Sequence, residues 1–198
     1  MQIAGLVLLL GAVAAFIAVP LALRSGGGND SSGPPSFELI VLGASGGVSE
    51  TGLSAYLLSS LSLASSPFYL ALDAGSMFGG ISHAAQQGAF TQALRDQFAA
   101  SRSALSFEGW VYTQRVLGFA ISHAHLDHTA GLIISSAADT RAAALGGAAK
   151  PIFATNYTAD RLRDHVFNGE IWANFANEGA PPQLGLYRYA RMQPRQNY

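Results

Sequence analysis

Three of the five histidines in this 198-residue chain lie within six residues of one another, at positions 123, 125 and 128, and Asp127 lies between them. Imidazole and carboxylate groups are the ligands that hold zinc and related divalent ions in proteins. The chain has no cysteine, which excludes thiolate metal sites, disulfides and a cysteine nucleophile. A lone histidine is most often structural, but core packing does not explain three beside an aspartate. This cluster is therefore the candidate metal site.

The position of the cluster in the chain favours the same interpretation. An apolar run from Val116 to Ile121 predicts a buried strand that ends just before it. In an extended segment, side chains two residues apart share a face, so His123 and His125 can point at one ion. A following turn would bring Asp127 and His128 toward a second ion. Two ions about 3.5 to 4 Å apart can activate a water and clamp the oxygens of a displacement at phosphorus.

Short apolar runs alternate with helical patterns along residues 37–165. Strands are predicted at residues 37–42, 55–58, 68–72, 116–121 and 151–154. A helix is predicted at 81–100, a helix end or loop at 137–149, and a second helix at 158–165 with Thr158 as its cap. Alternation of strands and helices predicts an α/β architecture.

The amino-terminal 24 residues differ from the rest of the chain. Residues 3–23 form an apolar run that is long enough, as a helix, to cross a bilayer. A transmembrane anchor and a cleaved signal peptide both fit it, and a buried core helix is the third alternative. Residues 25–36 are rich in Gly, Ser and Pro and predict a flexible linker. The expected location is thus membrane-anchored or in the secretory pathway, with a cytoplasm-facing domain left open, and residues 37–198 form the expected catalytic domain.

Composition and local motifs exclude other classes of function. The net charge of -1 and the 49% hydrophobic content describe a globular chain, so no nucleic-acid partner is expected. The glycine-rich turn from Gly43 to Gly47 lacks the spacing and the lysine of a phosphate-binding loop. Ser122 neighbours the histidines but lacks the surrounding pattern of a nucleophilic serine.

The string from Ser122 to Leu132 resembles the H-x-H-x-D-H signature of the metallo-β-lactamase superfamily. Its wider context resembles the class II cyclic-nucleotide phosphodiesterases within that superfamily. Four further stretches carry this resemblance, namely the glycines of 43–47, residues 54–58, residues 72–75, and residues 165–168 with Ile171 and Trp172.

The resemblance implies a four-layer αβ/βα sandwich that hydrolyses the 3′ ester bond of cyclic AMP or cyclic GMP with a metal-bound hydroxide, giving the 5′-monophosphate. It implies two divalent metal ions, zinc first with manganese and iron as alternatives. The implied ligands are His123, His125, Asp127 and His128, with Asp127 also catalytic. Asp73 would hydrogen-bond the ligand loop from behind and fix its geometry.

Relatives take a further histidine, a bridging aspartate and a last histidine from the second half of the fold. This sequence does not contain them, so the expectation is the first half of the sandwich, a carboxyl-terminally incomplete domain. His83 and His165 are expected to be structural or surface residues. Two alternatives stay open: another hydrolase of the same fold, acting on a thioester, a lactam or a nucleic-acid phosphodiester, and a non-catalytic membrane-tethered fragment. The oligomeric state is left open.

Overall fold

The computed structural model describes residues 36–47, 49–140 and 145–193. Within them a six-stranded sheet has its strands in sequence order, β1 to β6. The first three strands pair antiparallel and the last four pair parallel. The strands are β1 (Phe37–Gly43), β2 (Ala55–Ser60), β3 (Tyr69–Ala74), β4 (Val116–Ala120), β5 (Lys150–Thr155) and β6 (Tyr187–Met192).

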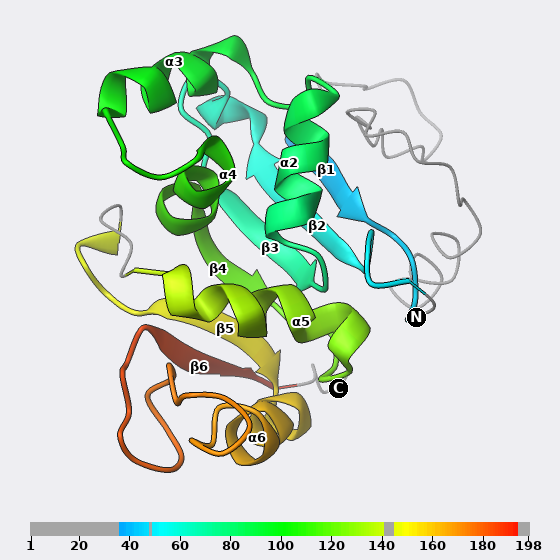
Figure 1. Cartoon of the computed structure of the whole chain (residues 1–198), viewed down its shortest axis with the longest axis vertical. Helices are drawn as coiled ribbons and strands as arrows, with labels where there is room; N and C mark the ends of the chain where they lie inside the picture. The colour runs from blue at the N-terminus through cyan, green and yellow to red at the C-terminus, as the bar shows by residue number, and fades with distance from the viewer. Residues whose placement is uncertain (1–35, 48, 141–144, 194–198) are drawn as a thin grey trace, which may run out of the picture.

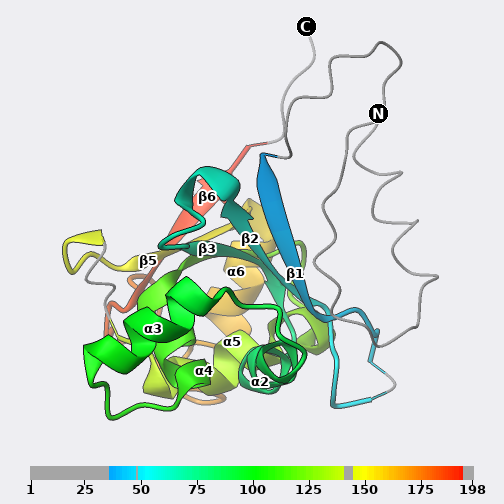
Figure 2. The same cartoon turned by 90° about the horizontal axis from the view of Figure 1, so that it is seen from above.

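The helices lie together on one side of this sheet, as the two views in Figures 1 and 2 show. Among them, α2 contacts β1, α5 contacts β3, and α6 contacts β5 and β6. The helices are α2 (Phe78–Gln86), α3 (Gln92–Ser101), α4 (Phe107–Trp110), α5 (Leu126–Ser135) and α6 (Asn156–His165), with short turns η2 (Leu61–Leu63) and η4 (Ser136–Ala138) and a π-helix η3 (Val111–Arg115).

The core lies between the sheet and these helices. Alternate strand residues that face the helices are fully buried, among them Leu57, Ala71, Phe119 and Ile152. Parallel strands β3, β4 and β5 end at the same edge of the sheet, and the loop from β4 to α5 begins there. The candidate metal cluster therefore lies at the carboxyl edge of the parallel strands, where open α/β sheets commonly bind their ligands.

The predicted α/β class and all five predicted strands are confirmed, but the helix predicted at 81–100 is wrong as one element. It is divided into α2 and α3. Gly88 has a positive φ of 75°, a backbone conformation that glycine adopts at little cost. Thr91 then caps α3, because its side-chain oxygen accepts a hydrogen bond from the Leu94 N–H at 3.3 Å.

Two further details of the prediction are corrected. Helix α6 begins at Asn156 and is capped by Thr155, whose hydroxyl accepts from the Thr158 N–H at 3.3 Å. The predicted cap, Thr158, lies inside the helix. Strand β6 was not predicted from the sequence, and it pairs parallel with β5 through six residue pairs from Lys150↔Tyr187 to Thr155↔Met192.

The predicted membrane anchor or signal peptide lies outside the described residues, as does nearly all of the predicted linker. Within the described ranges no helix combines the length and hydropathy needed to cross a bilayer. The longest of these helices, α3, α5 and α6, have ten residues each.

Candidate metal centre

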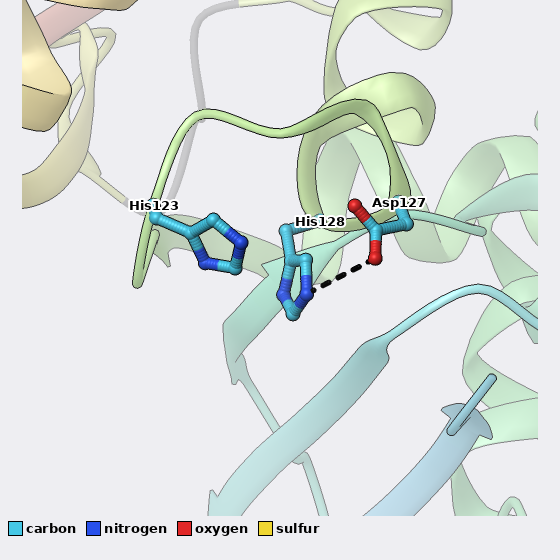
Figure 3. Close-up of side chains that lie close together, drawn as sticks. All are labelled: His123, Asp127 and His128. Carbon is cyan, nitrogen blue, oxygen red and sulfur yellow. Dashed lines mark ion pairs between the residues drawn. The ribbon is translucent and has the colours of Figure 1, made fainter. Parts of the chain in front are cut away.

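The loop after β4 and the first turn of α5 bring three of the predicted ligands together. One nitrogen or oxygen atom from each of His123, Asp127 and His128 lies within 4.8 Å of the other two, and Figure 3 shows the three side chains facing a common space. His128 Nε2 lies 3.4 Å from Asp127 Oδ2, the contact drawn as a dashed line. The His123 and His128 ring centroids are 4.0 Å apart. No other such group of metal-ligating side chains occurs within the described ranges.

His125 lies beside this group without belonging to it. Its ring stands edge-on to His123, with centroids 4.7 Å apart, and the residue is exposed. The backbone of His125 has a structural role, because its carbonyl accepts hydrogen bonds from the His128 N–H at 3.0 Å and the Thr129 hydroxyl at 2.9 Å. The role of His125 as a metal ligand stays a prediction. His83 and His165 are also outside the group.

Asp73, at the end of β3, hydrogen-bonds to Ser122 and His128, at the two ends of the segment that carries the candidate ligands. This segment, residues 122–128, is called the ligand loop. Asp73 Oδ1 accepts from the Ser122 backbone N–H at 2.8 Å, and the Ser122 hydroxyl lies 2.9 Å from both carboxylate oxygens. Its Oδ2 lies 2.8 Å from His128 Nδ1. Asp73 has a positive φ of 51°, a conformation that aspartate tolerates better than most residues. The side chain thus joins the end of β3 to both ends of the ligand loop.

These hydrogen bonds determine which ring nitrogens of His123 and His128 carry a lone pair that can bind a metal ion. An ionised Asp73 is only an acceptor, so His128 donates from Nδ1 and leaves the Nε2 lone pair facing Asp127. The Ser122 hydroxyl gives its proton to Asp73 and therefore accepts from His123 Nδ1, 3.0 Å away. Both imidazoles then present an unprotonated Nε2. This role of Ser122 was not predicted from the sequence, where its position just before the ligands is the one available signal.

The surroundings of His123 favour its neutral ring. Burial lowers the pKa of His123, and the neighbouring His128 and His125 lower it further, outweighing the attraction of Asp73 and Asp127. A metal ligand must be an unprotonated imidazole, because the metal takes the lone pair that a proton would occupy. The cluster therefore favours the form of His123 that can bind a cation.

Two glycines let α5 approach the end of β3 closely. A Cβ at Gly75 would overlap the backbone carbonyl oxygen of Asp127, and a Cβ at Gly131 would lie 2.6 Å from the Met77 nitrogen. The Gly131 N–H donates to the Gly75 carbonyl at 2.9 Å across this contact. The first turn of α5, which carries Asp127 and His128, thus packs directly against the loop after β3.

Replacing Gly75 with alanine is expected to destabilise the fold by about 1–3 kcal/mol, because the added methyl group forces β3 and α5 apart. Urea unfolding measures this effect. Gly79→Ala is the matched control, since a Cβ at Gly79 in α2 meets nothing within 4 Å. That substitution is expected to leave stability unchanged or to raise it by up to about 1 kcal/mol. Equal effects of the two substitutions would contradict the close approach at Gly75.

Comparison with known proteins identifies the family. Residues 37–195 match the family described as class II cAMP phosphodiesterases. A probable 3′,5′-cyclic-nucleotide phosphodiesterase of Yersinia pestis is 40% identical over 162 residues, which are 82% of this chain and 43% of the relative. A 3′,5′-cyclic-nucleotide phosphodiesterase of Aliivibrio fischeri is 38% identical over 159 residues, which are 80% of this chain and 44% of the relative.

The fold also matches a solved structure. The crystal structure of unliganded yeast PDE1 aligns with a TM-score of 0.66 at 22% sequence identity, over 81% of this chain and 52% of that one. This likeness confirms the expected fold. The chain spans less than half the length of the two bacterial relatives. Because the family match extends over most of its residues, the chain belongs to the class II cAMP phosphodiesterases.

Proposed function

We propose that this polypeptide takes part in the metal-dependent hydrolysis of 3′,5′-cyclic nucleotides, with cyclic AMP and cyclic GMP as the candidate substrates. The observation that carries the proposal is the convergence of His123, Asp127 and His128 on one space, braced by Asp73. The names of the bacterial relatives support the substrate class. The activity is proposed for a chain that spans less than half of those relatives.

The three converging side chains fit a divalent cation. Two imidazole nitrogens and one carboxylate are the ligand set of many catalytic zinc sites, which keep a fourth position open for water or substrate. The group is half-buried, so solvent can reach the open position. We propose zinc as the first ion, with manganese or iron as alternatives. A second ion beside it would need His125 and further oxygen or nitrogen ligands.

The residues of the chain hold and orient the groups that react. When bound, the ions supply an activated water and positive charge at the phosphate. In the reaction the water oxygen adds to phosphorus, the bond to the 3′ oxygen breaks, and that oxygen takes up a proton. Asp127 is the proposed catalytic residue, since its carboxylate can accept a hydrogen bond from the attacking water. Asp73 maintains the position and tautomer of His128, whose Nε2 lies 3.4 Å from Asp127 Oδ2.

Asp73→Asn is expected to weaken zinc binding by about 10- to 100-fold while the fold stays intact. Asparagine tolerates a positive φ, and its carbonyl can still accept from the Ser122 N–H. Its NH₂ group would face His128 Nδ1 and move the ring proton to Nε2, the nitrogen that faces Asp127. Isothermal titration with Zn²⁺ measures the loss, and thermal unfolding monitors the fold.

Asp96→Asn is the control for this substitution, because Asp96 is exposed on α3 and, within the described part of the chain, its carboxylate accepts a hydrogen bond from Gln92 in the same helix. It is expected to bind zinc like the unmodified chain. Equal zinc affinities for the two variants would show that the hydrogen bond between Asp73 and His128 does not support metal binding.

A substrate panel tests the proposed function directly. The purified chain, saturated with Zn²⁺ or Mn²⁺, is incubated with cyclic AMP, cyclic GMP, a β-lactam, a thioester and a DNA phosphodiester, and products are separated by chromatography. Formation of 5′-monophosphates from the cyclic nucleotides supports the proposal. Preferential turnover of another substrate supports a different hydrolase of this fold. Weak binding of one ion without any turnover supports a non-catalytic fragment.

A further inference from the structure

The half-buried cation Arg115 lies at the end of the sheet opposite the candidate metal centre. Arg115 is the last residue of the π-helix η3 and directly precedes β4, and Phe68 directly precedes β3. Because these two strands are parallel, both residues lie at the amino edge of the sheet, whereas the ligand loop lies at the carboxyl edge. π-Helices are rare and occur frequently at functional sites. A function of Arg115 would thus be separate from the metal centre.

Neutral groups surround the Arg115 guanidinium. Its Nη1 donates to the Ser66 hydroxyl at 3.1 Å, and its Nη2 donates to the Gln97 side-chain carbonyl at 2.8 Å. The guanidinium carbon lies 4.5 Å from the Trp110 ring centroid and 5.0 Å from that of Phe68. No carboxylate of the described segments forms an ion pair with it. Its positive charge therefore has no counter-ion in this part of the chain.

The guanidinium also keeps unused hydrogen-bond donors. It carries five N–H groups, more than the hydrogen bonds to Ser66 and Gln97 use. Its Nε is buried and has no acceptor among the residues described. Burial lowers the pKa of Arg115, and the electrostatic effect that opposes this shift comes from Tyr69, not from a carboxylate. Since partly desolvated charges are normally paired, this cation is prepared for an anion.

A hollow of about 580 Å³ opens beside Arg115. This volume is within the range of small-molecule sites, about 300–1,000 Å³. Among the described residues that line it, Arg115 alone is charged. The other lining residues are the apolar Phe68, Ala100 and Trp110 and the polar Gln97, Ser101 and Gln114. Three of them belong to the carboxyl-terminal half of α3, which lies at this end of the sheet (Figure 1).

A carboxylate fits this cation better than a phosphate group does. Its two oxygens match two N–H groups of a guanidinium, and its one negative charge equals the one positive charge of Arg115. A carboxylate is also flat, so it can lie in the guanidinium plane beside the rings of Phe68 and Trp110. A phosphate monoester carries about 1.5 to 2 negative charges at neutral pH. Part of that charge would lose its hydration without compensation.

We propose that this hollow, called the Arg115 hollow, is a second binding site for a small molecule that has one carboxylate and one apolar group. The carboxylate accepts hydrogen bonds from Arg115, and the apolar group lies against Phe68 and Ala100. The site is independent of the proposed hydrolysis, because none of its lining residues belongs to the ligand loop. It can therefore be tested without measuring turnover.

Titration of the full chain with benzoate, followed by proton–nitrogen NMR, tests the proposal. Trp110 lines the hollow and Trp172 does not, so the indole N–H signal of Trp110 is expected to shift while that of Trp172 stays. Benzamide is the matched ligand, because it has the same ring without the charge. It is expected to bind about tenfold more weakly, since hydrogen bonds to a charged acceptor are stronger. Inorganic phosphate and cyclic AMP complete the panel.

Three outcomes of this titration would overturn the proposal. Without any shift of the Trp110 signal, the hollow is not a site for carboxylates. Equal affinities for benzoate and benzamide would mean that the charge of Arg115 is not used. Tighter binding of phosphate or cyclic AMP at Trp110 would assign the hollow to phosphate groups instead.

Ala100→Glu adds a carboxylate to the hollow without removing any contact of Arg115. Ala100 is exposed on α3 and lines the hollow. The substitution is expected to lower the affinity for benzoate by about tenfold or more, because the new carboxylate competes for Arg115 and repels the ligand. Thermal unfolding checks that the fold is retained.

Ala99→Glu is the matched control, since Ala99 is the neighbouring exposed residue of α3 and is outside the lining of the hollow. This variant is expected to bind benzoate like the unmodified chain. If Ala100→Glu and Ala99→Glu bind benzoate equally well, the Arg115 hollow is not the binding site.

Discussion

Replacing His128 with alanine is expected to abolish the proposed cyclic-nucleotide hydrolysis and to weaken the proposed zinc binding by about a hundredfold or more, at least the loss seen when a residue supporting a metal ligand is removed. His128 is the centre of the site, since its Nε2 lies 3.4 Å from Asp127 and its Nδ1 lies 2.8 Å from Asp73. The substitution removes one of the three converging groups, and among the described residues it leaves the Asp73 carboxylate with its hydrogen bonds from Ser122. Zinc titration and product chromatography measure the two effects.

His165→Ala is the matched control, because His165 is exposed at the end of α6 and lies outside the converging group. It is expected to retain zinc affinity and turnover within about twofold, as surface substitutions away from special features usually do. Were His128→Ala to bind zinc as tightly as this control, the converging group would not be a metal site. Loss of turnover with unchanged zinc affinity would place the ion elsewhere.

The candidate site was largely predictable because its residues are adjacent in the sequence. His123, Asp127 and His128 lie within one loop and one helical turn, and the strand before them has a clear apolar pattern. Asp73 lies far away in the sequence, and only the family resemblance pointed to its contact with this loop. The Ser122 hydrogen bonds and the contact between Gly75 and Asp127 depend on how β3 and α5 pack, which a local pattern does not encode.

Elements whose pattern of apolar and polar residues is ambiguous were harder to predict. Strand β6 has the sequence Tyr-Arg-Tyr-Ala-Arg-Met, in which exposed Arg188 separates the buried Tyr187 and Tyr189, and it pairs with β5 only after the long loop from α6. Helices α2 and α3 share an apolar pattern that gave one predicted helix, and the break depends on the positive φ at Gly88. In both cases tertiary context decides the element.

The buried ion pair between Lys150 and Asp139 was also unpredictable, because a lysine after a loop normally lies at the surface. Both side chains have no exposed area, and Lys150 Nζ lies 2.7 Å from Asp139 Oδ1 and 3.0 Å from the Tyr112 carbonyl. The Tyr187 hydroxyl donates to Asp139 Oδ2 at 2.8 Å. These contacts link Asp139, just after η4, to Lys150 and Tyr187, the first residues of β5 and β6.

Lys150→Met is expected to destabilise the fold by about 3–5 kcal/mol at neutral pH, since it leaves the Asp139 carboxylate buried without its cation. The double variant Lys150→Met with Asp139→Leu is expected to recover a large part of that loss, because it removes the uncompensated charge as well. Urea unfolding measures both variants. A double variant as unstable as the single one would mean that shape rather than charge is decisive here.

The pH dependence of Lys150→Met distinguishes charge from packing further. Burial raises the pKa of Asp139 above its usual value, and Lys150 opposes that rise. Without Lys150 the pKa of Asp139 in the folded chain rises further, while the pKa in the unfolded chain stays near its usual value of about 4. Between these two values the folded chain holds a proton that the unfolded chain has released, so its stability falls as pH rises. The stability deficit of Lys150→Met is therefore expected to be smaller at pH 5 than at pH 7. A deficit that does not change with pH would assign the loss to packing alone.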